Sequence, residues 1–168
     1  MRPLQSIVAA AMLSLAAASA MAEEFKAGDI TIDQPWSRAT PKGAAVGVGY
    51  LVIHNHGAAP DRLIGGSADF AGAVAVHEMT SDNGVMRMRE MTSGLEIPAN
   101  GVVTLAPKGD HLMFTDLRRP LQKGESVKAI LVFEHAGSIP VAFQVGGVGA
   151  SGPGGVAKPE DAMKGMKM

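Results

Sequence analysis

The sequence predicts an all-β protein, an antiparallel β-sandwich or Greek-key barrel of about nine short strands. Glycine and proline are frequent, at 21 and 10 residues, and they divide the chain into short runs rich in valine, isoleucine, leucine and phenylalanine. No window shows a sustained apolar period of 3.6 residues, so the sequence offers no long amphipathic helix. Short strands separated by turns at near-regular spacing are typical of sandwiches and barrels.

The predicted strands are the apolar runs between these breaks. They span residues 29–33, 46–54, 61–64, 73–79, 85–91, 101–105, 111–115, 126–134 and 139–145. Alternation is clearest in the eighth run, where Val127, Ala129, Leu131 and Phe133 are expected to point inward and Lys128 outward.

Residues 1–22 have the features of a secretory signal peptide that is cleaved after Ala22. Arg2 precedes an apolar run over residues 7–18, and Ala20-Met21-Ala22 has the small-x-small pattern of a cleavage site. The run is shorter than the ~20 residues that span a bilayer, which disfavours a membrane anchor. We therefore expect an exported protein, with no stable membrane insertion after cleavage.

One domain is expected over residues 23–145, and a flexible glycine- and proline-rich tail that contains methionines over residues 146–168. Lysine and arginine total 15 against 16 aspartate and glutamate, so the charge balance does not indicate nucleic acid as a partner. The chain has no cysteine, which excludes disulfides, a thiolate metal site and a cysteine nucleophile.

Methionines and histidines are concentrated in residues 77–113. Five of the eight methionines beyond residue 22 and two of the five histidines lie there: Met79, Met86, Met88, Met91 and Met113, with His77 and His111. Thioether and imidazole are neutral donors, and a cluster of them suits Cu(I) better than a hard cation.

A hairpin is predicted in this stretch, because Asn83-Gly84 tolerates positive φ at both positions of a two-residue turn. With that turn at the tip, His77, Met79, Met86 and Met88 share one face of the hairpin. Glu90 falls on the same face. The other face carries charged and polar side chains: Glu78, Thr80, Arg87 and Arg89.

His111 and Met113 form a second H-x-M pair, whose side chains point to one side of an extended strand. A third strand or loop that brings this pair against the hairpin is expected to complete a site of two histidines and two methionines. Any one of these residues alone is better explained as core filling or as a hydrogen-bonded histidine. The joint pattern favours a metal site, because residues 23–78 and 114–162 contain no methionine.

The chain resembles the PCu(A)C family of periplasmic copper chaperones, whose signature is H-x(10)-M-x(21)-H-x-M. Ten residues separate His77 from Met88, and His111-Leu112-Met113 closes the pattern. The gap between Met88 and His111 has 22 residues, one more than the signature, and fits a one-residue loop change near residues 99–101. Met79 and Met86 therefore stay open as alternative ligands.

The resemblance extends over most of the domain, roughly residues 30–145. It includes QPWSRATP at 34–41, GYL at 49–51, DRL at 61–63, GVMRMR at 84–89 and VF at 132–133. It implies a cupredoxin-like fold and a Cu(I) carrier that supplies copper for assembly of the copper A centre of cytochrome c oxidase. The implied recipient is an oxidase subunit or a thiol-bearing copper chaperone.

Three other functions stay open. The protein could store copper or confer copper tolerance, it could be a copper-dependent redox enzyme, or it could be an interaction domain with methionines as an adaptable surface. We expect a monomer without catalytic activity.

Several residues fall outside the predicted site. His54 and His56 could bind a divalent metal, although solvated loop histidines are commoner. Trp36 is expected in or near the core. The tail methionines Met163, Met166 and Met168 could capture copper. Arg118-Arg119 is expected in a solvated turn, or as a contact for an acidic partner.

Overall fold

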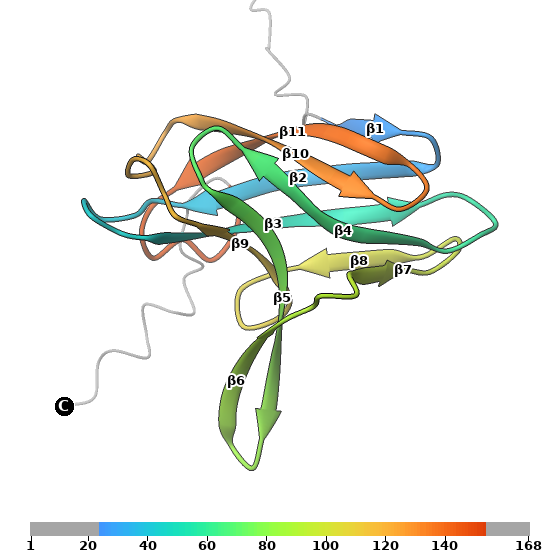
Figure 1. Cartoon of the computed structure of the whole chain (residues 1–168), viewed down its shortest axis with the longest axis horizontal. Coiled ribbons are helices and arrows are strands. Elements are labelled where there is room, and N and C mark those ends of the chain that lie inside the picture. The colour runs from blue at the N-terminus through green and yellow to red at the C-terminus, as the bar shows by residue number, and fades with distance from the viewer. Residues whose placement is uncertain (1–23, 154–168) are drawn as a thin grey trace, which may run out of the picture.

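A computed structural model describes residues 24–153, and this part of the chain is all-β, as predicted (Figure 1). The eleven strands within it are β1 Phe25–Ala27, β2 Ile30–Arg38, β3 Val46–Asn55, β4 Asp61–Ala68, β5 Ala73–Asp82, β6 Val85–Glu90, β7 Leu95–Ile97, β8 Val102–Leu105, β9 His111–Thr115, β10 Ser126–Phe133 and β11 Gly137–Gly146. Each of the nine predicted runs is a strand. The additional strands, β1 and β7, have three residues each, too few to show a period of two. Residues 24–153 include no helix long and apolar enough to cross a membrane.

Seven of the strands close into a barrel. Their order is β2-β11-β10-β4-β5-β9-β3, and β3 pairs back with β2. Neighbours in this ring are antiparallel except β11 and β2, which run parallel with Gln144 opposite Trp36. The sheet is therefore mixed, whereas the sequence predicted an antiparallel one. The parallel pair joins segments near opposite ends of the domain, and no local pattern marks such a contact.

The barrel interior is filled by alternate residues of its strands. In β10, Val127, Ala129, Leu131 and Phe133 are buried and Lys128 is exposed, which confirms the predicted alternation. Three phenylalanines form an edge-to-face chain in this core, with Phe114 at 5.0 Å from Phe70 and 5.5 Å from Phe143 between ring centroids. Because the chain has no cysteine, this packing must stabilise the fold without disulfides.

Residues beyond β11 also pack on the barrel. Ala150 is 3% exposed and contacts Trp36 and Tyr50, whose ring centroids lie 4.5 Å apart. Arg38 Nε donates a hydrogen bond of 2.7 Å to the Ala150 carbonyl. The packed chain therefore continues past residue 145, where the sequence placed the end of the domain. The predicted signal peptide and the tail methionines lie outside the described residues.

Strands β5 and β6 extend from the barrel as a two-stranded ribbon (Figure 1). Residues 73–77 of β5 pair with β9, whereas residues 77–82 pair with β6. His77 is the residue where β5 changes partner. The first half of β5 therefore belongs to the barrel wall, and the second half belongs to the ribbon.

Candidate metal centre

The β5–β6 ribbon has the predicted hairpin turn and register. Asn83 and Gly84 have φ of 49° and 80°, as a two-residue turn of this kind requires. The cross-strand partners are Glu78 and Arg89, Met79 and Met88, Thr80 and Arg87, Ser81 and Met86, and Asp82 and Val85. This pairing confirms the segregation of side chains inferred from the sequence.

One face of the ribbon carries thioethers and the other carries charges. Met79 and Met88 are directly opposite each other, and Met86 is the next residue of β6 on the same face. On the reverse face Arg89 Nε donates a hydrogen bond of 2.7 Å to Glu78 Oε1. The soft donors are therefore separated from the ionic pair by the ribbon itself.

Strand β9 brings the second H-x-M pair beside the base of the ribbon. His111 is directly opposite His77, and Met113 is opposite Ala75. The centroids of the two imidazole rings are 5.9 Å apart. On the neighbouring strand β6, Glu90 is the cross-strand partner of His77 and lies on the same face. The row Glu90, His77, His111 thus crosses three strands where the ribbon leaves the barrel.

The four residues of the predicted site occupy one continuous region of this face. Met113 lies one row toward the barrel from the histidines, and Met88 lies one row toward the ribbon tip. Of the alternative ligands, Met79 lies in the same row as Met88, and Met86 lies one row nearer the ribbon tip on the same face. Register alone therefore places His77 and His111 between the thioethers of Met113 and Met88.

His111 is held in an orientation that suits a ligand. It is 6% exposed, and its Nδ1 lies 3.1 Å from the carbonyl oxygen of Gly109. A carbonyl can only accept, so the hydrogen bond places the proton on Nδ1. In the neutral ring Nε2 then keeps its lone pair, the usual arrangement of a metal-binding histidine.

His77 has a buried ring nitrogen without a hydrogen-bond partner in the described part of the chain. This atom is Nδ1. Burial, and next the neighbouring His111, lower the pKa of His77, while Glu90 opposes this change. The ring is therefore neutral at pH 7 and has a lone pair available. A buried polar atom left unpaired costs free energy, and a bound ion removes that cost.

The methionines differ in how they are packed. Met91 packs against the main hydrophobic core, as a gap-filling methionine does. Met86 and Met88 are 51% and 50% exposed. Met79 and Met113 are half-buried but lie outside both core clusters of residues 24–153. Core filling thus explains Met91 and does not explain the other four methionines, which are Met79, Met86, Met88 and Met113.

The two histidines of the H-x-H segment already have partners. His54 Nε2 lies 2.9 Å from Asp33 Oδ2, and His56 Nε2 lies 3.0 Å from Thr31 Oγ1. Their rings stack with centroids 6.0 Å apart. Within residues 24–153 no three histidine or acidic side chains converge to hold a metal ion. The structure therefore offers no support for a second site at this position.

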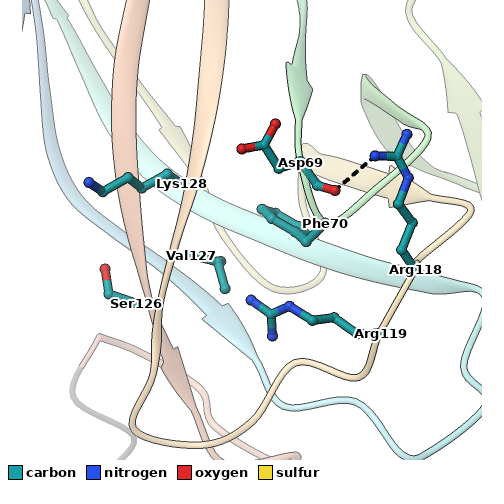
Figure 2. Close-up of a pocket in the computed structure, with 7 residues that line it drawn as sticks. All are labelled: Asp69, Phe70, Arg118, Arg119, Ser126, Val127 and Lys128. Carbon is teal, nitrogen blue, oxygen red and sulfur yellow. Dashed lines mark hydrogen bonds between the residues drawn. The ribbon is translucent and has the colours of Figure 1, made fainter.

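Figure 2 shows a pocket between Phe70, the Arg118-Arg119 segment and the start of β10. Arg118 donates a hydrogen bond of 3.0 Å to the Asp69 carbonyl. Arg119 pairs with both carboxylate oxygens of Glu125 at 2.9 Å. No histidine or methionine lines this pocket, so it is separate from the candidate metal centre.

Comparison with known proteins supplies a family. Residues 30–145 match the family model described as "Putative lipoprotein LpqE-like". The chain belongs to this LpqE-like family. A curated relative, "Putative lipoprotein Lxx21020" of Leifsonia xyli subsp. xyli, is 31% identical over 128 residues, which cover 76% of each chain.

Solved structures similar to this LpqE-like chain are PCuAC domains. The copper-bound PCuAC domain from PmoF2 is 28% identical with a TM-score of 0.63, covering 73% of this chain and 97% of that domain. The Cu(I) form of DR1885 from Deinococcus radiodurans is 27% identical with a TM-score of 0.54, covering 76% and 82%. The predicted resemblance to the PCu(A)C family and its cupredoxin-like fold is confirmed.

Two features of the centre have no signal in the sequence. One is the direct pairing of His77 with His111, since 33 residues separate them and no local pattern sets that register. The other is the packing next to Met113. Its cross-strand partner Val48 packs against the cluster of Trp36 and Tyr50. Both depend on pairing between strands that are distant in the chain.

Proposed function

We propose that this protein is a periplasmic Cu(I) carrier that holds one ion with His77, Met88, His111 and Met113. The observation that carries the proposal is the buried, unpartnered Nδ1 of His77 within the described residues, beside His111 and the thioethers. Two neutral imidazoles and two thioethers favour Cu(I) over zinc or hard ions. Similar structures bind copper according to their names, which supports the same cargo here.

A role in delivery follows from the exposure of the donors. Met88 is half-exposed on a ribbon that projects from the barrel, so a recipient can displace it first. Thiolates bind Cu(I) more strongly than thioethers, which gives transfer a direction. We propose a cytochrome c oxidase subunit with its copper A centre, or a thiol-bearing copper chaperone, as the recipient. The leader-like residues 1–22 and the lipoprotein names of the relatives support export.

Competition with a chromogenic chelator tests the site. The apo protein, titrated anaerobically with Cu(I), is expected to bind about one tight equivalent. His111→Ala and Met113→Leu should each weaken that binding by at least about tenfold, because a direct ligand is lost. Met91→Leu is the matched control, since Met91 packs on the core, and it should bind as the parent does. Unchanged competition by both ligand variants contradicts the assignment.

Transfer and turnover separate delivery from the alternatives. The copper-loaded protein, mixed with a reduced soluble copper A domain, is expected to return in the apo form from a sizing column. Copper that stays with the loaded protein indicates storage or tolerance instead. Sustained oxygen consumption by the loaded protein with excess reductant indicates a redox enzyme.

A further inference from the structure

The part of the ribbon beyond His77 carries three thioethers on one face. Met79 and Met88 are cross-strand partners, and Met86 follows Met88 by two residues on the same face. Beyond His77, β5 has β6 as its one pairing partner in residues 24–153. We call these three side chains, Met79, Met86 and Met88, the thioether trio.

Packing does not account for the trio. Every residue of β6 is exposed, and Met86 and Met88 each leave about half of their surface in water. Met79 is half-buried but belongs to neither hydrophobic cluster of residues 24–153, so core packing explains none of the three. Met91, one residue past the end of β6, shows the alternative, because its side chain packs on the core.

The register allows the three sulfur atoms to converge. Directly opposite residues have Cβ atoms ~4.5–5.5 Å apart, and same-face neighbours along one strand are ~7 Å apart. A methionine sulfur stands two bonds beyond Cβ on a chain with three rotatable bonds. Three sulfurs from such positions can meet at one ion. Three neutral thioethers form a soft donor set, which selects Cu(I).

We propose that the thioether trio is a second Cu(I) position, which shares Met88 with the histidine site. Since one sulfur belongs to both donor sets, the ion can pass between them by exchanging ligands while it stays bound to Met88. Glu90 neighbours Met88 on β6 and lies opposite His77, so one carboxylate borders both positions. This inference rests on the proposed carrier function and places a waiting position for copper between the histidine site and a recipient.

Cu(I) and Ag(I) titrations of a variant without the two imidazoles test the inference. The full chain carries Met163→Leu, Met166→Leu and Met168→Leu, so that tail methionines do not contribute. With His77→Ala and His111→Ala added, the protein is expected to keep about one equivalent of Cu(I), bound at least tenfold more weakly than by the parent. In methionine-methyl NMR, Ag(I) should shift the methyl resonances of Met79, Met86 and Met88.

Two further substitutions provide the matched comparison. Adding Met79→Leu and Met86→Leu to the imidazole-free variant should abolish the remaining binding, whereas adding Met91→Leu should preserve it. If the alanine variant does not fold, the parent with both histidines is titrated instead. Ag(I) beyond the first equivalent should then shift the Met79 and Met86 methyl resonances.

The outcomes distinguish this inference from the carrier function. No Cu(I) binding by the parent overturns both proposals. Tight binding by the parent that is lost completely with the imidazoles overturns the thioether trio alone. Residual binding with unmoved Met79 and Met86 resonances also overturns it, because the ion then has other ligands.

Discussion

The side chain of His77 has a buried nitrogen that costs free energy in the apo protein and that is available to bind a metal ion. Its Nδ1 is buried without a partner in the described chain, and burial followed by the nearby His111 lowers its pKa below 6.5. The unfolded chain, with an ordinary imidazole, therefore binds more protons between the two pKa values. The contribution of neutral His77 to stability is complete above about pH 6.5 and is lost as the pH falls.

This sign gives a prediction for the apo protein. The urea midpoint is expected to fall between pH 7.5 and pH 5.5, and His77→Gln should reduce that fall, because glutamine does not titrate. Unfolding followed by circular dichroism at the two pH values measures both. An equal fall in the parent and the variant means that His77 is not the titrating group responsible.

Asp61 shows how one buried carboxylate connects distant loops. It is 7% exposed and accepts backbone N–H hydrogen bonds from Arg62, His135 and Ala136 at 2.7, 2.9 and 2.9 Å. Burial acts to raise the pKa of Asp61, but these amides outweigh it and lower the pKa. The carboxylate thereby fixes the turn between β10 and β11 to the start of β4.

Removing this carboxylate should destabilise the barrel. Asp61→Ala leaves amides of the β10–β11 turn without their acceptor, at an expected cost of about 2–4 kcal/mol in the free energy of unfolding. Urea unfolding measures it. Asp69→Ala is the control, because the Asp69 side chain is exposed and its carbonyl, which Arg118 uses, is retained. The control is expected to stay within about 0.5 kcal/mol of the parent.

At the scale of elements, the stability of the β5–β6 ribbon depends more on its turn than on the hydrophobic core of the barrel. Gly84 has φ of 80°, and the space around its Cα is open. Gly84→Ala therefore introduces no clash but costs about 1–2 kcal/mol of backbone strain. We expect faster amide exchange in β6 and weaker Cu(I) binding, with little change in the melting temperature, because the barrel does not include β6.

Gly147→Ala is the control for this change, since Gly147 also has open space and lacks a positive φ in the left-handed region. It should leave amide exchange in β6 and Cu(I) binding unaltered. If Gly84→Ala lowers the free energy of unfolding of the barrel by as much as it lowers the opening free energy of the β6 amides, the ribbon and the barrel unfold together.

The features that could be predicted from the sequence are those set by residues close together in the chain. The Asn83-Gly84 turn sets the hairpin register locally, so the face shared by Met79 and Met88 could be derived from the sequence alone. The closure of the barrel, the parallel pairing of β11 with β2 and the burial of Ala150 depend on distant segments. Local periodicity contains no information about such partners.

The same limit applies to the candidate centre. Composition and hairpin pairing predicted candidate ligands among the histidines and methionines of residues 77–113, and the H-x-M pattern put His111 and Met113 on one side of a strand. Only the resemblance to the PCu(A)C signature selected Met88 over Met79 and Met86. Which strand would lie beside the hairpin could not be inferred. The position of His77 at the change of pairing partner, and the unpartnered state of its Nδ1 in the described chain, required the barrel.

At the scale of the whole molecule, the fold separates a closed body from a projecting arm. The barrel has a continuous core and paired strands all round, so it can hold His111 and Met113 rigidly without disulfides. The ribbon has no core of its own and projects Met86 and Met88 into solvent. Rigid and exposed donors therefore meet at His77, which suits a carrier that must hold an ion and also release it.

This arrangement predicts that Cu(I) stabilises the whole protein. An ion that binds only the folded state adds RT ln(1 + [L]/Kd), about 4 kcal/mol when the free ion is at 1,000 times Kd. For a domain of this size each kcal/mol raises the melting temperature by roughly 2–8 °C. Anaerobic melts with and without one equivalent of Cu(I) should therefore differ by several degrees. The shift should be smaller in His111→Ala, which binds the ion more weakly, and should keep its full size in Met91→Leu, whose side chain lies on the core. Identical melts of the parent with and without Cu(I) would favour an interaction domain, in which the methionines serve as contact surface and hold no metal.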